Sequence, residues 1–236
     1  MTEPEERVFD WTPRHDPRSL SFPARELFRR TEVANHTWRA PVTPLDQGSE
    51  GACVGYGWTH EALTTPVRVD LAQLAQKQWP TEPHAFATSV YRAAQKIDEW
   101  GGEAYEGTSV NAGAKIMRER GLIKEWRWAF GVDDVMLSIL NVGPVVLGIN
   151  WYSGMYVAKN GIVDVSGSLV GGHCLLANAT RKKGVIFEDE EAIGWVNSWG
   201  PGYGRNGRAW IRKSQLATLL SQQGEAAVPV RRSYGR

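Results

Sequence analysis

The sequence predicts an α+β protein with two lobes, and three observations support this prediction. Patterns typical of amphipathic helices lie mostly before residue 130, whereas short runs of β-branched and aromatic residues follow residue 131. Helices first and strands later are typical of α+β folds rather than of alternating βα units. The 236 residues can bury a sizeable core and contain no internal repeat. We therefore expect an N-terminal arm (1–37), a helical lobe (38–130) and a β-rich lobe (131–236) that ends in a short basic tail.

The first half carries the helical patterns. Prolines and charges fill the arm, where we expect only one short helix around residues 24–30. Residues 66–85 read as a loop-rich insertion with one helical stretch. The helical patterns of the lobe cover residues 53–63, 86–100 and 108–121. Gly101 and Gly102 are expected to end the second helix. In the third pattern Thr108 or Ser109 is expected to be the N-cap, and Gly121 lies just beyond the end of the helix.

The second half begins with a short helical pattern over residues 133–143 and then turns to β-type sequence. These runs are rich in valine, isoleucine and aromatic residues, and turn residues separate them. The strands expected from them span 144–150, 161–165, 173–180, 184–189, 193–199 and 208–212. The charged residues between 181 and 191 indicate a solvated turn.

Composition excludes several functional classes. A formal net charge of +1 provides no global field for nucleic acid or a membrane surface. No apolar run reaches the roughly 18 residues of a membrane helix, and the N-terminus lacks a signal-peptide pattern. Two cysteines form no disulfide framework, so we expect a cytoplasmic protein. Paired-cysteine, H-E-x-x-H and P-loop motifs are missing, and the glycines of 202–207 lead into a strand, so we expect no metal and no cofactor.

Five residues form a candidate catalytic set. Cys53 lies in "DQGSEGACVGYGW", where a helix is expected to begin, and Gln47 lies six places before it. His173 starts an expected strand in "GGHCLL". Asn197 and Trp199 end another in "WVNSWG". Taken singly, Cys53 reads more often as a buried small hydrophobic residue, and only the combination favours catalysis.

These residue types match the needs of a thiol hydrolase. A cysteine reacts as its thiolate, which a helix N-terminus and a neighbouring imidazolium both stabilise. His173 would transfer the proton, and the Asn197 amide oxygen would hold one tautomer of the ring. The backbone N–H of Cys53 and the side-chain amide of Gln47 would stabilise the oxyanion.

The same segments resemble the papain family (C1) of cysteine peptidases. "WRAPVTPLDQGSEGACVGYGW" is similar to the family's nucleophile segment, "GGHCLLANAT" to its histidine strand and "GWVNSWGPGYGRNGRAWI" to its asparagine hairpin. "VGPVVLGINWYSGMYVAKNGIVDV" is similar to its G-P-V segment, and the motifs follow the family order. The resemblance implies a two-lobe papain-like fold with a cleft between the lobes. It implies Cys53 as nucleophile, His173 as acid–base, Asn197 as orienter, Gln47 as oxyanion donor, and Trp199 as a shield over the histidine–asparagine pair.

The sequence departs from the family pattern beside the nucleophile. Glu50 replaces the first cysteine of the C-G-[SA]-C-[WY] signature, and Val54 replaces its aromatic residue. The family loop that lines its main specificity pocket has no clear match, and "WGGEAYEGTSV" occupies its place in a form similar to bacterial members. We place Gly107, Thr108, Trp151 and Gly172 along the substrate cleft, with Trp100 as a further candidate near it. The alternation of a strand turns Cys174 away from His173, which makes it a core thiol.

The expected activity is peptide-bond hydrolysis of a peptide or protein substrate. Two alternatives stay open. One is a non-catalytic binding or structural module on the same fold. The other is acyl transfer or isopeptide cleavage through the same thioester. We expect a bacterial or phage-type member without the inhibitory prosegment of secreted relatives, whose arm packs against the body of the protein. Substrate, cleavage mode and oligomeric state cannot be read from the sequence.

Overall fold

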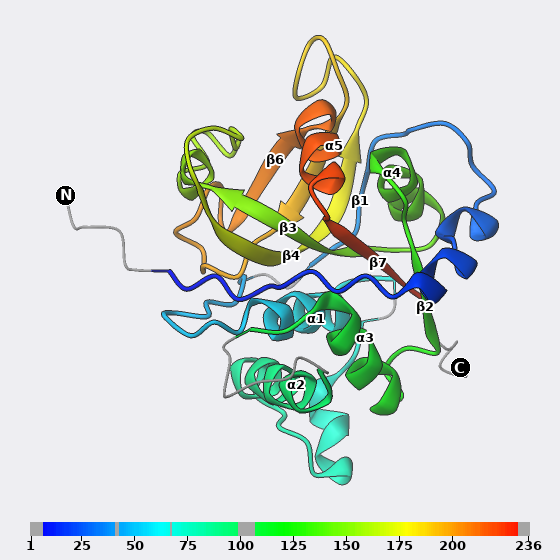
Figure 1. Ribbon diagram of the computed structural model, residues 1–236, viewed down its shortest axis with the longest axis vertical. Coiled ribbons are helices and arrows are strands. Elements are labelled where there is room, and N and C mark those ends of the chain that lie inside the picture. Colours follow the sequence, from blue (N-terminus) through cyan, green and yellow to red (C-terminus); the bar gives the residue numbers. More distant parts are fainter. Residues whose placement is uncertain (1–6, 41–42, 67, 99–106, 231–236) are drawn as a thin grey trace.

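The computed structural model describes residues 7–40, 43–66, 68–98 and 107–230 (Figure 1). In this part of the chain the helices are α1 (Cys53–Leu63), α2 (Pro83–Ile97), α3 (Val110–Glu119), α4 (Val132–Asn141) and α5 (Lys213–Ser221). The strands are β1 (His36–Thr37), β2 (Glu125–Trp128), β3 (Val145–Tyr152), β4 (Leu169–Arg181), β5 (Ala192–Val196), β6 (Arg208–Arg212) and β7 (Glu225–Val230). Short 3-10 helices are η1 (Pro17–Ser21), η2 (Ala24–Leu27), η3 (Leu71–Lys77) and η4 (Ser153–Tyr156).

Local sequence explains where the helices begin. α1 has the bounds that the sequence predicts, from Cys53 to Leu63. The side chain of Glu82 accepts from the Ala85 amide before α2, and the Ser109 hydroxyl accepts from the Ala112 amide before α3. Of the two predicted N-caps of α3, Ser109 is therefore the one observed. α2 ends at Ile97, before the glycines expected to stop it, which lie outside the described residues together with Trp100.

The strands form one antiparallel sheet in the order β2-β7-β3-β4-β5-β6, and β1 pairs with the far end of β4. Helices α1, α2 and α3 lie on one side of the sheet in Figure 1. The α+β prediction is confirmed, with a helical N-terminal part and an antiparallel sheet built mainly from the C-terminal part. β1 and β2 precede residue 131 in the sequence and nevertheless belong to the sheet.

The sheet buries a hydrophobic cluster on each face. Alternate residues of β3 and β4 point to opposite sides, as strand geometry requires. Val146 and Leu176 pack with the helices α1, α2 and α3, whereas Leu147 and Leu175 pack with α4 and α5. Cys174 belongs to the first cluster, together with Cys53. The sheet thus separates the core of the helical part from the core behind it.

Two expected strands are wrong, and three strands and one α-helix of the described structure were not expected. Residues 161–165 form no ladder, since Ile162 makes only isolated bridges with Lys159 and Trp210. Residues 184–189 form a turn that the bond from the Gly184 amide to the Phe187 carbonyl closes. The segments that form β1, β2, β7 and α5 carry no local pattern from which we expected a strand or helix.

The N-terminal arm packs against the body of the protein along an unexpected route. We call residues 7–12 the arm segment. In Figure 1 this segment, in dark blue, crosses the molecule as an extended chain between β4 and α1. η1 and η2 follow, and the chain then returns to β4 through β1. No helix in the described part of the chain has the length and apolar character needed to cross a bilayer.

Candidate active site

Cys53 is the first residue of α1, so its sulfur lies at the positive end of the helix dipole. Ala52 precedes it with a non-helical backbone and gives no side-chain cap. The backbone N–H groups of Asp10, Cys174 and Val54 donate hydrogen bonds to the thiol. Because Cys174 directly follows His173 in β4, the bond from its amide brings the sulfur beside the position of that histidine.

His173 and Asn197 form a direct hydrogen bond. The His173 Nε2 atom lies 2.7 Å from Asn197 Oδ1, and both side chains are fully buried. Asn197 follows the end of β5, and its Oδ1 also accepts from the Ser198 amide at 2.8 Å. The hydrogen bonds with His173 and from the Ser198 amide together hold the Asn197 amide oxygen toward the imidazole ring. In the described structure His173 Nδ1 is buried and has no hydrogen-bond partner.

Gln47 joins the same network through Ser198. Its Oε1 accepts from the Ser198 hydroxyl at 2.6 Å, and its backbone N–H donates to the Ser198 carbonyl at 2.8 Å. The side-chain Nε2 donates to the Glu50 carbonyl at 2.9 Å and to the Val8 carbonyl of the arm segment at 3.4 Å. Ser198 therefore links Gln47 to Asn197. We assigned Ser198 no role from sequence, although it lies within the quoted "WVNSWG".

Aromatic side chains surround the imidazole. The ring of Trp199 is 5.0 Å from that of His173, centroid to centroid, and Trp151 packs edge-on at 4.8 Å. Phe9 of the arm segment contacts both His173 and Trp199 at 5.8 Å. Trp199 thus lies over the histidine, and Trp151 is fully buried behind it. Such contacts exclude water from the hydrogen bond between His173 and Asn197.

Burial determines the protonation states of this site. It raises the pKa of the Cys53 thiol to about 11, despite the three backbone donors on the sulfur. It lowers the pKa of His173 to about 4, against the opposing effect of the Asn197 hydrogen bond. Both groups are therefore neutral near pH 7 in this conformation. We expected a stabilised thiolate from the sequence, and the structure differs because both groups are fully buried, with the arm segment in contact with each of them.

The arm segment contacts both sides of the site. The Trp11 amide donates to the Gly172 carbonyl at 2.9 Å, and the Thr108 amide donates to the Asp10 carbonyl at 2.9 Å. A Cβ atom on Gly107 would lie 2.3 Å from that same carbonyl. Of the expected cleft residues, Gly107, Thr108 and Gly172 thus contact the arm, whereas Trp151 contacts His173. Residues 100–106 of the expected specificity loop lie outside the described residues.

Three further residues at this site escaped the sequence analysis. Asp10 is almost fully buried, and its carboxylate lies so close to Gly51 that a Cβ there would overlap it. Trp11 is 3% exposed, and its indole N–H donates to Glu225 Oε2 at 2.9 Å. Glu225 begins β7, more than 200 positions after Trp11. No local sequence pattern signals this contact, because it depends on the tertiary fold.

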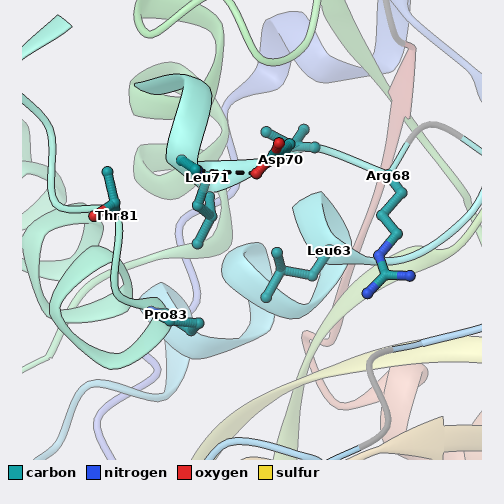
Figure 2. Close-up of a pocket in the computed structure, with 8 residues that line it drawn as sticks. Leu63, Arg68, Asp70, Leu71, Thr81 and Pro83 are labelled. Atoms are coloured by element: carbon teal, nitrogen blue, oxygen red, sulfur yellow. Dashed lines mark hydrogen bonds between the residues drawn. The ribbon is translucent and has the colours of Figure 1, made fainter. Parts of the chain in front are cut away.

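A separate cavity of about 430 Å³ lies at the other end of α1 (Figure 2). Its lining residues are Leu63, Arg68, Val69, Asp70, Leu71, Ala72, Thr81 and Pro83. Asp70 caps η3 there by accepting from the Ala72 amide at 3.0 Å. None of the candidate catalytic residues lines this cavity. In the described part of the chain, no group of three or more His, Cys, Asp or Glu side chains is arranged to hold a metal ion.

Comparisons with solved structures identify the fold. No protein-family model and no curated protein matches this sequence. Among solved structures, the chain is similar to xylellain, a cysteine protease from Xylella fastidiosa, with a TM-score of 0.60 and 16% identity over 95% of this chain and 91% of that one. It is also similar to digestive procathepsin L 3 of Tenebrio molitor larval midgut (TM-score 0.54, 11% identity, 89% and 75% covered).

A third similar structure is the bromelain protease of Ananas comosus in complex with the E64 inhibitor. The TM-score is 0.54 at 10% identity, over 80% of this chain and 93% of that one. At these identities the comparison concerns the fold. The order of helices and antiparallel strands and the likeness to these structures agree with the resemblance found in the sequence. The chain has the papain-like fold of these cysteine proteases.

Proposed function

We propose that this protein is a peptidase with Cys53 as its nucleophile and His173 as its acid–base group. One observation carries the proposal most strongly. The Cys53 thiol, at the N-terminus of α1, accepts from the amide next to His173, and the His173 ring is bonded to the Asn197 amide oxygen at 2.7 Å. A thiol, an imidazole and an orienting amide thus lie in one buried site. That the similar structures are described as cysteine proteases supports the same reading.

The hydrogen bond to Asn197 selects the tautomer that catalysis requires. An amide oxygen accepts, so His173 Nε2 carries the hydrogen and Nδ1 has the lone pair. Nδ1 takes the proton from Cys53 Sγ, and the resulting thiolate attacks the peptide carbonyl carbon. The carbon–nitrogen bond breaks, and the departing amine receives the proton from Nδ1. Water then adds to the thioester, gives up a proton to Nδ1 and releases the acid with the free thiol.

Gln47 is the proposed side-chain donor to the oxyanion. Its amide is oriented by the Ser198 hydroxyl on Oε1, which leaves the Nε2 hydrogens to face carbonyl oxygens. One of these is the Val8 carbonyl of the arm segment, at 3.4 Å. The backbone N–H of Cys53, in the first turn of α1, is the second proposed donor. A carbonyl of a bound peptide would take the place of the Val8 carbonyl.

Catalysis requires the arm segment to move. Cys53 is 0% exposed, and an incoming carbonyl cannot reach its sulfur while residues 7–12 are in place. The neutral thiol and imidazole belong to this covered state. When the arm leaves, water lowers the pKa of the thiol and raises that of the imidazole, because hydration favours both charged forms. The ion pair would form in the open state.

The test is digestion of a peptide library by the full-length protein, its Cys53→Ser variant and its Trp11→Gly variant, whose arm loses the buried indole and its bond to Glu225. We expect cleavage by the parent, faster cleavage by Trp11→Gly and none by Cys53→Ser. An added amine acceptor separates hydrolysis from acyl transfer, since transfer yields an amide in place of an acid. Cleavage that persists in Cys53→Ser would contradict the proposal. The absence of cleavage in both the parent and Trp11→Gly would favour the non-catalytic module.

A further inference from the structure

A cavity between η1, α3 and β2 takes no part in the site around Cys53. Its volume is about 470 Å³, which is within the range of small-molecule binding sites. Three parts of the chain enclose it: residues 16–22 of the arm, one face of α3, and β2. We call it the η1 cavity. None of the candidate catalytic residues lines it.

Aromatic side chains form two walls of the η1 cavity. Trp126 and Trp128 come from β2, and because they are two positions apart in a strand their side chains share one face of the sheet. Phe22 comes from the arm and is 48% exposed, so its ring is open to a ligand. Such rings pack well against another flat aromatic group. The walls therefore favour a ligand with an aromatic ring.

Two cations of α3 line the same cavity. Lys115 and Arg118 are three positions apart, so they lie on one face of the helix. The Arg118 guanidinium lies over the ring of Trp126, 5.3 Å from its centroid. Among the described residues, neither cation forms an ion pair with a carboxylate. Both charges are thus available to an anion.

The two carboxylates of the η1 cavity are already paired with arginines. Asp16 pairs with Arg18 at 2.6 Å, and Glu125 pairs with Arg127 at 3.0 Å. Hydrogen bonds from Arg18 lower the pKa of Asp16 to about 2, and the charge of Lys115 contributes less. Asp16 is therefore ionised and bound to Arg18 at neutral pH. The cavity thus keeps an excess of positive charge on its α3 side.

Asn111 adds a buried polar group that has no partner. It precedes Lys115 by one turn of α3, so it lies on the face that lines the cavity. The residue is 6% exposed, and its side-chain amide forms no hydrogen bond within the described structure. A buried amide without a partner is costly, and a polar group of a ligand would supply the missing bond. This observation is independent of the charges and also indicates a ligand.

The walls, the cations and the amide together define one class of ligand. A neutral aromatic molecule would leave the cations unpaired, and an anion without a ring would leave the aromatic walls uncovered. A carboxylate pairs with a guanidinium through two parallel hydrogen bonds in one plane, so a carboxylate on a flat ring suits both features.

We propose that the η1 cavity is a binding site for an aromatic carboxylate. The ring of this ligand packs on Phe22 and Trp126. Its carboxylate pairs with Lys115 and Arg118, and the Asn111 amide donates to one of its oxygens. The proposal does not depend on the proposed function, because no candidate catalytic residue is involved.

The binding test compares two probes of nearly the same shape on the full-length protein. Naphthalene-2-carboxylate carries the charge, and naphthalene-2-carboxamide lacks it. We expect calorimetry to detect the carboxylate at millimolar concentration. The carboxamide should bind at least about tenfold more weakly, because charge-assisted hydrogen bonds are about twice as strong as neutral ones. No binding of the carboxylate, or equal binding of both probes, would overturn the proposal.

A pair of variants locates the site. Lys115→Gln/Arg118→Gln should bind naphthalene-2-carboxylate at least about tenfold more weakly than the parent. Lys96→Gln/Lys183→Gln is the matched control, since it removes two exposed positive charges that do not line the cavity. The carboxylate should also raise the urea midpoint of the parent and the control, and not that of Lys115→Gln/Arg118→Gln, because a ligand of the folded state stabilises it. An equal loss of binding in both variants would show that net charge, and not this cavity, attracts the probe.

Two further comparisons test the walls and the amide. Benzoate and cyclohexanecarboxylate carry the same charge, and only benzoate is flat, so we expect benzoate to bind about threefold or more tightly. Asn111→Leu keeps a similar volume without the amide and should weaken naphthalene-2-carboxylate by about threefold or more. Equal affinity of the two single-ring probes would contradict the aromatic walls, and unchanged affinity in Asn111→Leu would contradict the role of the amide.

Discussion

The site that the arm segment covers has two ends, and they differ in how they are built. At one end, Cys53, His173 and Asn197 are defined by their chemical groups and by the hydrogen bond of 2.7 Å between two of them. At the other end, the space that Trp11 fills is defined by two missing side chains, at Gly148 and Gly172, and by one buried carboxylate, that of Glu225. The comparison teaches that reactive groups can be recognised by residue type, whereas the space for Trp11 depends on which side chains are missing at positions that the fold brings together.

The strongest test of the catalytic end is Asn197→Ala. It removes the acceptor of His173 Nε2 and frees the ring to change tautomer and orientation. We expect kcat to fall by about 100- to 10,000-fold, the range for loss of positioned acid–base catalysis. Asn178→Ala is a matched control, since Asn178 is also a buried amide, and its Nδ2 donates to the Trp38 carbonyl away from the site. If the two variants turned over alike, Asn197 would have no orienting role.

Two variants of Gln47 distinguish a role as hydrogen-bond donor to the oxyanion from a purely structural role. Gln47→Ala should lower kcat by about 100- to 1000-fold with little change in KM, since an oxyanion donor acts on the transition state. Gln47→Glu keeps an oxygen for the Ser198 hydroxyl and lacks the N–H donor. We expect both variants to lose turnover, with Cys53 labelled by iodoacetamide at nearly the parent rate. Recovery of activity in Gln47→Glu would show that the bond to Ser198, rather than the donor, is what matters.

Because Glu225 is buried, its ionisation should make the free energy of unfolding depend on pH. Burial raises the pKa of Glu225 from 4.5 to about 7, with a smaller contribution from the Asp98 charge, so the folded protein binds this proton more tightly than the unfolded chain. The stabilising effect of the proton is complete below pH 4.5 and is lost as the pH rises through 7. Relative to Glu225→Gln, the parent should lose on the order of 3 kcal/mol across this window.

Urea unfolding at a series of pH values measures this difference. The Gln side chain does not titrate, so Asp98 and the other carboxyls affect both proteins and largely cancel in the comparison. Above pH 7.5 the difference between parent and variant should be constant. A difference that stays constant from pH 4.5 to 7.5 would mean that Glu225 ionises as in an exposed site, and its carboxylate would not be buried as described.

Sequence predicted the elements whose signals are local. The bounds of α1 and the Ser109 cap follow from neighbouring residues. β7 was missed because it starts with a buried glutamate and contains Pro229, both atypical of an inner strand. The fold tolerates this proline because β3 pairs with β7 only over residues 225–227. The route of the arm segment depends on contacts with Thr108 and Gly172, which are far apart in sequence, so no local pattern reveals it.

The central claim is that Cys53 is a reactive thiol covered by the arm segment, and Gly148→Ala tests it directly. The added methyl group meets the Trp11 indole first, so it should displace the arm while β3 stays intact. Brief iodoacetamide treatment and peptide mapping then give the labelling rate of each cysteine. We expect Cys53 to be labelled about tenfold or more faster in Gly148→Ala than in the parent, given the 1–3 kcal/mol cost of overpacking, while the buried Cys174 stays unlabelled in both. Equal rates at Cys53, or faster labelling of Cys174, would contradict it.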